Sequence, residues 1–253
     1  MPYADNDGVH IYYQVEGDGT PLLLHHPLTS SHRVWYRNGF VDALKYRYRV
    51  ITMDMRGHGR SSKPPRQTAY GWDMRVTDII AVLDSAGADR VHMVGYSAGG
   101  FGGFAMLRYA PHRLCSLTIG AAHPYGEDSY PIGKNGVDAE ALLQDFAVAA
   151  GEPLQHNLKS ATLKKDVTPI AYILSQGVPS YEDVIENVDI PCLLFSGEND
   201  IRYQRIQKCA GIIPNARFIP MPDMGHFKAF VHINQVLPHI IKFLEECDAK
   251  ARY

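Results

Sequence analysis

Val91-His-Met-Val-Gly-Tyr-Ser-Ala-Gly-Gly100 joins a short apolar run to a segment of small residues. The pattern predicts a strand, a sharp turn and then a helix. Gly95 and Gly99 lie two residues before and after Ser97, where a strained turn leaves no room for a side chain. We therefore expect the turn to present Ser97 as a nucleophile.

A serine between glycines also has an ordinary explanation. In a chain with 22 glycines the pattern can arise by chance, and Ser97 would then only cap the following helix. The apolar run before it and the small residues after it favour the nucleophile, because that role needs a strand and a helix on these two sides. A nucleophilic serine also needs a histidine base and a carboxylate that orients the histidine.

Composition limits the class of protein. The chain has 253 residues, 45% of them hydrophobic, which suffices for one large α/β domain with a substantial core. The formal net charge is −2. We therefore expect small-molecule partners, and neither nucleic acid nor an anionic membrane. Composition leaves the oligomeric state open.

The cysteines and the first residues indicate a compartment. Four cysteines are scattered without a Cys-x-x-Cys pair, which is typical of reduced thiols. The start of the chain has neither a basic segment nor an apolar block, and no apolar run approaches the length of a membrane span. We therefore expect a cytoplasmic location.

Apolar runs alternate with amphipathic segments along most of the chain. This order predicts an α/β fold with a mostly parallel central sheet covered by helices on both faces, and a functional site at the carboxyl ends of the strands. We expect strands at residues 9–15, 21–24, 49–53, 91–94, 114–119, 191–195 and 216–219. We expect helices at residues 35–46, 73–86, 99–109, 203–213 and 231–246.

The alternation stops between residues 123 and 188. Helical patterns at 138–150 and 161–174 follow a loop-like stretch and have no strand between them. We predict a small helical lid at 123–188, inserted into a core that consists of residues 1–122 and 189–253. The alternative is that these helices are ordinary connections between strands.

Two loops late in the chain supply partners for Ser97. His226 lies directly after the last expected strand, where a side chain can reach the carboxyl edge of the sheet. Asp200 follows the preceding strand and therefore lies at the same edge. These positions select His226 as the candidate base among twelve histidines, and Asp200 as the candidate acid.

Several motifs in sequence order give the chain a resemblance to a known family. They are Gly95-Tyr-Ser-Ala-Gly99, Gly197-Glu-Asn-Asp200, Gly225-His226 and Asp54-Met-Arg-Gly-His-Gly-Arg-Ser61. Over nearly its whole length the chain resembles enzymes of the α/β-hydrolase fold superfamily, whose catalytic residues follow in the order Ser, acid, His. The short lid and Leu24-His-His-Pro-Leu-Thr-Ser-Ser31 most resemble small carboxylesterases and enol-lactone hydrolases.

Three other carboxylates lie near these motifs. The resemblance assigns Asp54 to loop architecture, through contacts with Arg56 and local N–H groups. Glu198 and Asp223 lie close to the proposed acid and base, and we expect them to be solvated loop charges. The resemblance places the acid at Asp200.

The resemblance also indicates the donors of an oxyanion hole. Ala98, directly after the nucleophile, supplies one backbone N–H. Where relatives carry His-Gly followed by the second donor, this chain reads His26-Pro-Leu28, so we expect Leu28 to supply the second N–H. Pro27 has no N–H to donate, and it stiffens the turn.

We expect no metal ion and no other cofactor. The adjacent His25 and His26 point to opposite sides of an extended segment, and no third ligand clusters with them. The glycines after the turn lack the G-x-G-x-x-G order of a dinucleotide site. His26, Tyr96 and Tyr125 are candidate substrate contacts, although tyrosines in the insertion more commonly pack its helices.

The residue types favour acyl transfer to water. Relatives that open epoxides or displace halide carry an aspartate in the turn between the strand and the helix, where this chain has Ser97. The expected substrate is a small carboxylic ester or lactone, cleaved through an acyl-enzyme. Carbon–carbon bond hydrolases, perhydrolases and acyltransferases of the same fold use similar residues. A ligand sensor with slow or absent turnover is the alternative of another class.

Overall fold

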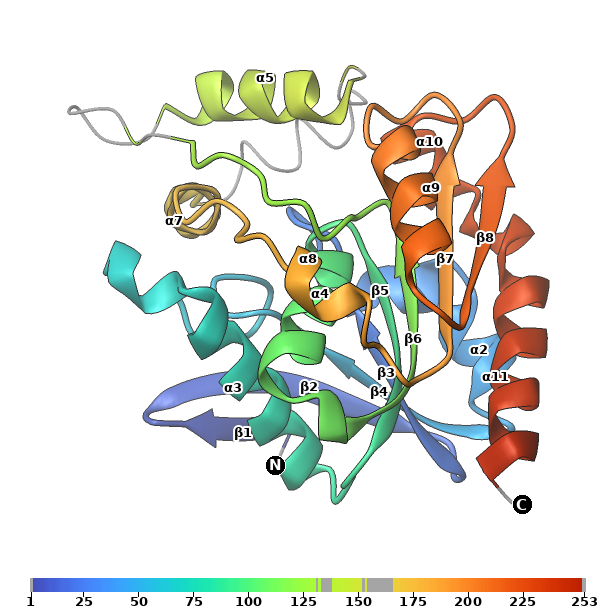
Figure 1. Cartoon of the computed structure of the whole chain (residues 1–253). Helices are drawn as coiled ribbons and strands as arrows, with labels where there is room; N and C mark the ends of the chain where they lie inside the picture. The colour runs from blue at the N-terminus through green and yellow to red at the C-terminus, as the bar shows by residue number, and fades with distance from the viewer. Residues whose placement is uncertain (1, 131, 133–137, 152, 154–165, 252–253) are drawn as a thin grey trace.

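A central sheet organises the computed structural model, which describes residues 2–130, 132, 138–151, 153 and 166–251 (Figure 1). Its eight strands lie in the order β1-β2-β4-β3-β5-β6-β7-β8. Strands β3 to β8 run parallel to one another, and β2 pairs antiparallel with β4, which confirms the predicted, mostly parallel sheet. The strands are β1 (Tyr3–Asn6), β2 (Val9–Glu16), β3 (Thr20–His25), β4 (Tyr48–Met53), β5 (Val91–Tyr96), β6 (Leu114–Gly120), β7 (Cys192–Gly197) and β8 (Ala216–Met221).

Strand β1 is an addition to the predicted strands. Its four residues are mostly polar, and only Ala4 is buried, so no alternating apolar pattern marks it. It pairs antiparallel with β2 through Asp7 and Gly8, whose φ angles are 50° and 81°. A two-residue hairpin needs positive φ at these positions, which glycine and aspartate tolerate.

Helices cover both faces of the sheet (Figure 1). Helices α3, α4, α8 and α9 pack on one face, and α1, α2, α10 and α11 pack on the other. None of the described helices is both long and apolar enough to cross a lipid bilayer. The α-helices are α1 (Arg33–Arg37), α2 (Phe40–Leu44), α3 (Trp72–Ser85), α4 (Ala98–Tyr109), α5 (Ala139–Ala150), α7 (Thr168–Leu174), α8 (Glu182–Ile185), α9 (Tyr203–Ile212), α10 (His226–Val231) and α11 (Leu237–Ala251). The 3₁₀-helices of the described residues are η1 (Gln67–Tyr70), η2 (Pro111–Arg113) and η3 (Ile233–Gln235).

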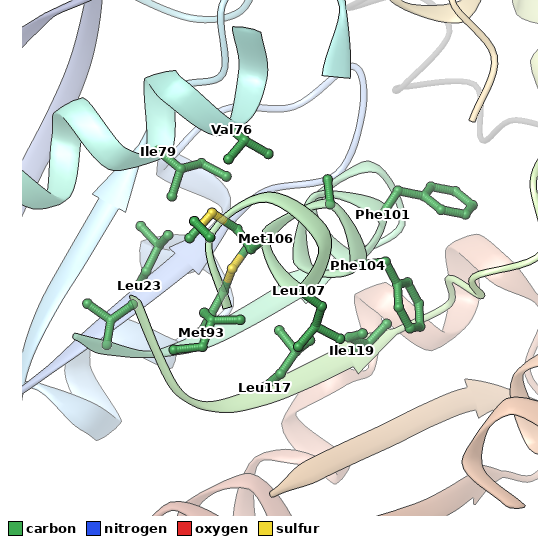
Figure 2. Close-up of a cluster of buried hydrophobic side chains, with 14 of the residues drawn as sticks. Leu23, Val76, Ile79, Met93, Phe101, Phe104, Met106, Leu107, Leu117 and Ile119 are labelled. Atoms are coloured by element: carbon green, nitrogen blue, oxygen red, sulfur yellow. The ribbon is translucent and has the colours of Figure 1, made fainter. Parts of the chain in front are cut away.

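The two faces of the sheet form separate hydrophobic clusters, because successive strand residues point to opposite sides. On β3, Leu23 belongs to the cluster under α3 and α4, whereas Leu22 and Leu24 belong to the cluster on the other face. Figure 2 shows Leu23 and Met93 of the sheet packed against Met106 of α4. Burying a side chain of this size contributes about 1.5–3 kcal/mol to folding, so the core holds the strand ends firmly in place.

Two of the predicted helices are divided in the structure. Residues 35–46 form parts of α1 and α2, which are separated at Gly39, where φ is 75°. Such a left-handed residue ends a helix. Residues 231–246 span the end of α10, η3 and most of α11, with Pro238 in the first turn of α11. Proline is tolerated in a first turn but interrupts a helix interior, so one continuous helix cannot form here.

Helices α5, α7 and α8 occupy the chain between β6 and β7. Figure 1 shows α5 above the edge of the sheet at which the parallel strands end. Leu142, Ile170 and Ile173 of this region pack with Leu28 from the loop after β3. The predicted helix at 161–174 lies partly outside the described residues. The division into a core and a lid at 123–188 stays a prediction.

Candidate active site

Ser97 occupies the turn between β5 and α4. Its φ of 51° and ψ of −115° are strained for a residue with a side chain. Its N–H donates to the Gly120 carbonyl at 2.8 Å, which fixes the turn to β6. A Cβ atom at Gly95 would lie 2.2 Å from the Gly99 carbonyl oxygen, and one at Gly99 would lie 2.1 Å from the His25 carbonyl oxygen. The glycines of the motif are therefore sterically required.

His226 and Asp200 meet Ser97 at the carboxyl edge of the sheet. Asp200 follows the end of β7, and His226 begins α10 after β8. Nε2 of His226 lies 3.0 Å from Oγ of Ser97, and its Nδ1 lies 2.7 Å from Oδ2 of Asp200. All three side chains are buried. The fold thus brings together the three residues that their positions in the sequence selected.

The carboxylate of Asp200 is held in its charged form. Burial alone would raise its pKa, but hydrogen bonds from the His226 ring and from the Arg202 N–H lower the pKa below its usual range. Arg202 is held in turn by Glu127, whose two oxygens accept from its Nε and Nη2 at 2.5 and 2.9 Å. An ionised Asp200 can orient the imidazole and stabilise its protonated form.

The other carboxylates considered lie elsewhere. Glu198 and Asp223 are exposed. Asp54 is buried and accepts hydrogen bonds from the N–H and Nδ1 of His32, at 2.7 and 2.8 Å, and from the N–H of Arg60 at 2.8 Å. Burial alone would raise the pKa of Asp54, but these bonds lower it to about 2. Asp54 therefore ties two loops together as an anion.

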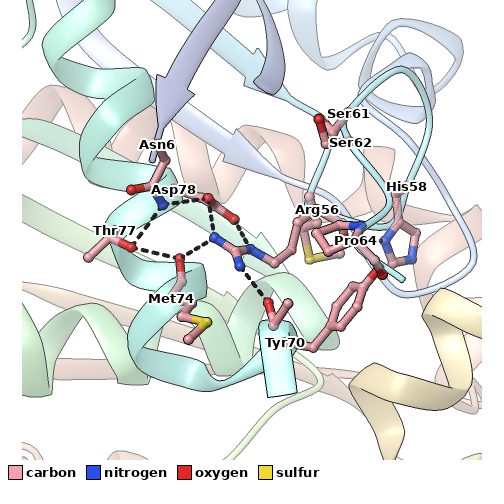
Figure 3. A network of polar contacts seen from close by, with 12 residues as sticks. Asn6, Arg56, His58, Ser61, Ser62, Pro64, Tyr70, Met74, Thr77 and Asp78 are labelled. Carbon is pink, nitrogen blue, oxygen red and sulfur yellow. Dashed lines mark hydrogen bonds and ion pairs between the residues drawn. The ribbon is translucent and has the colours of Figure 1, made fainter. Parts of the chain in front are cut away.

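Arg56 pairs with Asp78 of α3, so the expected contact with Asp54 is wrong. Its Nε and Nη2 lie 2.5 and 2.6 Å from the two Asp78 oxygens, and it also donates to the carbonyls of Ala69 and Met74 (Figure 3). A guanidinium favours this forked geometry because two parallel hydrogen bonds form at once. Asp78 lies 22 residues further along the chain, where no local motif connects it with Arg56.

Leu28 and Ala98, the predicted oxyanion donors, line one cavity together with Ser97. The backbone at Leu28 forms a tight turn, in which the Ser30 N–H donates to the Pro27 carbonyl at 3.3 Å. Thr29, within this turn, has a φ of 63°. Ala98 is the first residue of α4, where a helix offers its N–H no carbonyl partner. Both N–H groups thus belong to backbone beside the Ser97 side chain.

The adjacent histidines lie behind this turn. Burial lowers the pKa of His25 to about 4, and its Nδ1 lies 3.3 Å from the Gly99 carbonyl oxygen. His26 is fully buried, with Nδ1 2.8 Å from the Pro27 carbonyl oxygen and Nε2 accepting the Met55 N–H at 3.0 Å. His26 thus holds the backbone of this turn through Pro27 and Met55. It does not line the Ser97 cavity, where a contact with substrate was expected. The described residues contain no group of three or more His, Cys, Asp or Glu that could hold a metal ion.

A small cavity of about 60 Å³ lies over Ser97. Its apolar lining comes from the loop after β3, helices α3, α4 and α7, and the chain after α7, namely Leu28, Trp72, Phe101, Ile173, Leu174 and Val178. A more open cavity of about 770 Å³ shares four of its residues, Glu127, Asp128, Tyr130 and Arg202. The enclosed space suits a small apolar group next to the serine hydroxyl.

Tyr96 and Tyr125 do not line the Ser97 cavity, in which contacts with substrate were expected. Tyr96 is buried, its hydroxyl donates to the His226 carbonyl at 2.7 Å, and its ring centre lies 4.6 Å from that of Phe230. Tyr125 lines the larger cavity, with the Lys208 ammonium 4.8 Å from its ring centre. Tyr96 therefore supports the candidate base.

Two residues of α3 line the Ser97 cavity although no motif marks them. They are Trp72 and Arg75. Together with Val76 and Ile79 they lie at the i, i+3, i+4 and i+7 positions of one helix face. A charged residue is rare on the buried face of a helix, and this irregularity is the signal that could have pointed to Arg75.

Known proteins share both the sequence pattern and the fold. A family model described as alpha/beta hydrolase fold matches residues 20–139. A Bacillus subtilis (strain 168) protein, a candidate 2-succinyl-6-hydroxy-2,4-cyclohexadiene-1-carboxylate synthase, is 25% identical over 91% of this chain and 92% of its own length. The enol-lactonase from Burkholderia xenovorans LB400 superposes with a TM-score of 0.80 at 18% identity, over 96% of this chain and 100% of its own. An N-acyl homoserine lactone degrading enzyme gives a TM-score of 0.71 at 25% identity, with the same coverage.

Proposed function

Because the chain belongs to the α/β-hydrolase fold superfamily, we propose that it is a serine hydrolase that cleaves a small carboxylic ester or lactone. The observation that carries the proposal is the continuous hydrogen-bonded path from Ser97 through His226 to Asp200. A serine hydroxyl needs this support to act as a nucleophile at neutral pH. Similarity to a lactone-degrading enzyme at 25% identity supports the substrate class.

The first half of the proposed reaction forms an acyl-enzyme. Nε2 of His226 accepts the Ser97 proton while Oγ attacks the carbonyl carbon of the ester or lactone. Asp200 stabilises the imidazolium that forms, because it is ionised and 2.7 Å from Nδ1. When the tetrahedral intermediate collapses, the bond to the alcohol oxygen breaks, and His226 gives its proton to that oxygen.

The second half returns the enzyme to its starting state. A water molecule gives a proton to His226 as its oxygen attacks the acyl carbon, and collapse of the second intermediate breaks the bond to Oγ. The proton then returns to Ser97, and the carboxylic acid leaves. In both intermediates the carbonyl oxygen carries a negative charge, which the N–H groups of Ala98 and Leu28 are proposed to bind.

Covalent labelling tests the proposal directly. A fluorophosphonate is expected to add one phosphonyl group to the protein, which intact-mass and peptide measurements assign to Ser97. The Ser97→Ala variant should remain folded, take up no label and lose about 10⁴-fold or more of the ester turnover. If the wild-type protein took up no label and turned over no ester, the result would contradict the proposal and favour a ligand sensor.

A substrate panel separates the proposed reaction from related ones. Esters and lactones should be turned over by the wild type and not by Ser97→Ala. Turnover confined to 1,3-diketones would indicate carbon–carbon bond hydrolysis, and turnover confined to an added alcohol or peroxide acceptor would indicate an acyltransferase or perhydrolase. Either restriction would replace the proposed reaction.

A further inference from the structure

Arg75 extends from α3 into the cavity that contains Ser97. Only 6% of its surface is exposed, and its guanidinium lies 3.3 Å from the ring centre of Trp72, which lines the same cavity. The Trp72 ring is itself held in place, because its Nε1 donates to the Gly177 carbonyl at 2.7 Å. The positive charge of Arg75 is therefore stacked on a fixed aromatic surface beside the candidate nucleophile.

The hydrogen bonds of this guanidinium are incomplete among the described residues. Within the described part of the chain, buried Nε and Nη2 of Arg75 have no partner. Arg56, another buried arginine next to α3, is fully paired instead, since both oxygens of Asp78 and two carbonyls accept its hydrogen bonds (Figure 3). Asp78 also accepts from Asn6, so its oxygens are already occupied.

A buried cation without partners is costly to the folded protein. Burial, with Arg56 adding repulsion, lowers the pKa of Arg75 to about 9, although Tyr181, Asp78 and Asp73 act in the opposite direction without accepting a hydrogen bond from Nε or Nη2. The group therefore stays protonated at neutral pH. Among the described residues, the fold thus holds a positive charge with two unpaired guanidinium nitrogens, which is the condition of a binding group awaiting a ligand.

The remaining charges of the cavity do not neutralise Arg75. Glu127 gives both its oxygens to Arg202. Asp128 is exposed to solvent. Most of the other lining is apolar. A ligand in this cavity therefore meets one unmatched cation among hydrophobic side chains.

We propose that Arg75 binds a carboxylate of the substrate, so that the ester or lactone cleaved at Ser97 carries a second, acidic group. The inference rests on the proposed function and narrows its substrate class. A planar carboxylate accepts two parallel hydrogen bonds from a guanidinium. One negative charge also matches the single unmatched cation and the small volume better than a phosphate does. Trp72 and Phe101 would pack against the chain that joins the carboxylate to the scissile carbonyl.

Matched substrates test this assignment. The mono-4-nitrophenyl esters of succinic, glutaric and adipic acid are compared with the 4-nitrophenyl esters of butanoic, pentanoic and hexanoic acid, in which a methyl group replaces the carboxylate. For at least one pair, we expect the wild type to favour the acid at least 10-fold in kcat/KM. Arg75→Met should lower kcat/KM for that acid about 100-fold, mainly through KM, and leave its neutral partner within about 3-fold, as expected for a charge-assisted hydrogen-bonded pair.

Two further variants serve as controls. Arg66→Met removes one positive charge from the exposed surface near α3. It should leave kcat/KM unchanged for both the acidic and the neutral ester. Arg75→Lys keeps the charge but not the fork, and should recover part of the preference for the acid. Arg75→Met should unfold at a urea concentration equal to or above that of the wild type, because it removes an unpaired buried charge. If Arg75 instead stabilised the fold, Arg75→Met would unfold at a lower urea concentration than the wild type.

Binding to Ser97→Ala separates this proposal from the proposed reaction. Calorimetry should detect binding of the dicarboxylate mono-ester to Ser97→Ala, and much weaker binding to the Ser97→Ala, Arg75→Met double variant. This difference is expected even if the wild type turns over no ester. Any of three results would overturn the carboxylate site. The wild type could show equal kcat/KM for acidic and neutral esters, or Arg75→Met could lower kcat/KM equally for both. The double variant could also bind the dicarboxylate mono-ester as tightly as Ser97→Ala does. If Arg75→Met does not fold, Arg75→Lys and the substrate preference of the wild type decide the question.

Discussion

The hydroxyl of Tyr96 donates a hydrogen bond to the main-chain carbonyl of His226 at 2.7 Å. The residue before the candidate nucleophile therefore supports the residue proposed as its base. Tyr96 lies at the end of β5, and His226 lies 130 positions later at the start of α10. This contact couples the two loops on which the Ser97 to His226 distance depends.

Removing that hydroxyl should loosen the base without removing it. In Tyr96→Phe the ring can keep its packing, but the His226 carbonyl keeps only its helical hydrogen bond and loses this second donor, at a cost of about 0.5–1.5 kcal/mol in the free energy of unfolding. We expect kcat to fall several-fold with little change in KM. Urea unfolding and steady-state kinetics measure the two effects. Wild-type values in both would show that the contact has no role in either.

The choice of Asp200 as the acid can be tested against its neighbours. Asp200→Asn keeps the shape but removes the charge, so kcat should fall about 10³- to 10⁴-fold. Glu198→Gln and Asp223→Asn, at exposed positions, should retain nearly full activity. Kinetics on the three purified variants decide between them. Full activity of Asp200→Asn together with a large loss in Glu198→Gln would reverse the assignment.

The strained backbone at position 97 has a measurable consequence. With φ at 51° and ψ at −115°, Ser97 has a conformation that glycine adopts more easily. Ser97→Gly should therefore be more stable than Ser97→Ala by about 1 kcal/mol, after allowance for the greater freedom of glycine in the unfolded chain. Both variants are expected to be inactive, so thermal or urea unfolding provides the comparison. A less stable glycine variant would argue against strain.

A buried histidine predicts acid sensitivity. His123 is fully buried, and neither ring nitrogen makes a hydrogen bond among the described residues, although Nε2 lies 3.5 Å from Oε1 of Glu127. Burial outweighs the attraction of Glu127 and lowers the pKa of His123 from 6.5 to about 4. Between these two values the unfolded chain binds the proton and the folded chain does not, so stability falls as the pH decreases through this window. The loss is about 2 kcal/mol between pH 7 and pH 5.

Replacing this ring with a non-titrating one tests the effect. His123→Phe should reduce the difference in unfolding free energy between pH 7 and pH 5 by about 2 kcal/mol, because phenylalanine cannot bind the proton. Urea titrations of wild type and variant at both pH values give the comparison. An unchanged difference would mean that other groups, such as the buried His25, carry the acid sensitivity.

Much of the fold could be predicted because its signals are local. The strands of the parallel sheet are short apolar runs, and their order with the helices leaves few possible architectures. The short, polar β1 has no such signal, since its place depends on pairing with β2. The breaks at Gly39 and Pro238 do have local causes, which a long helical pattern concealed.

Ser97, Asp200 and His226 could be selected from the sequence because each follows a strand, and the ends of parallel strands meet at one edge. The partners of buried charges have no such rule. The pairing of Arg56 with Asp78 and the unmatched charge of Arg75 depend on how α3 packs beside the Asp54 loop and α4. Periodicity and strand order are properties of neighbouring residues, whereas the environment of a buried polar group is created only when distant segments pack together.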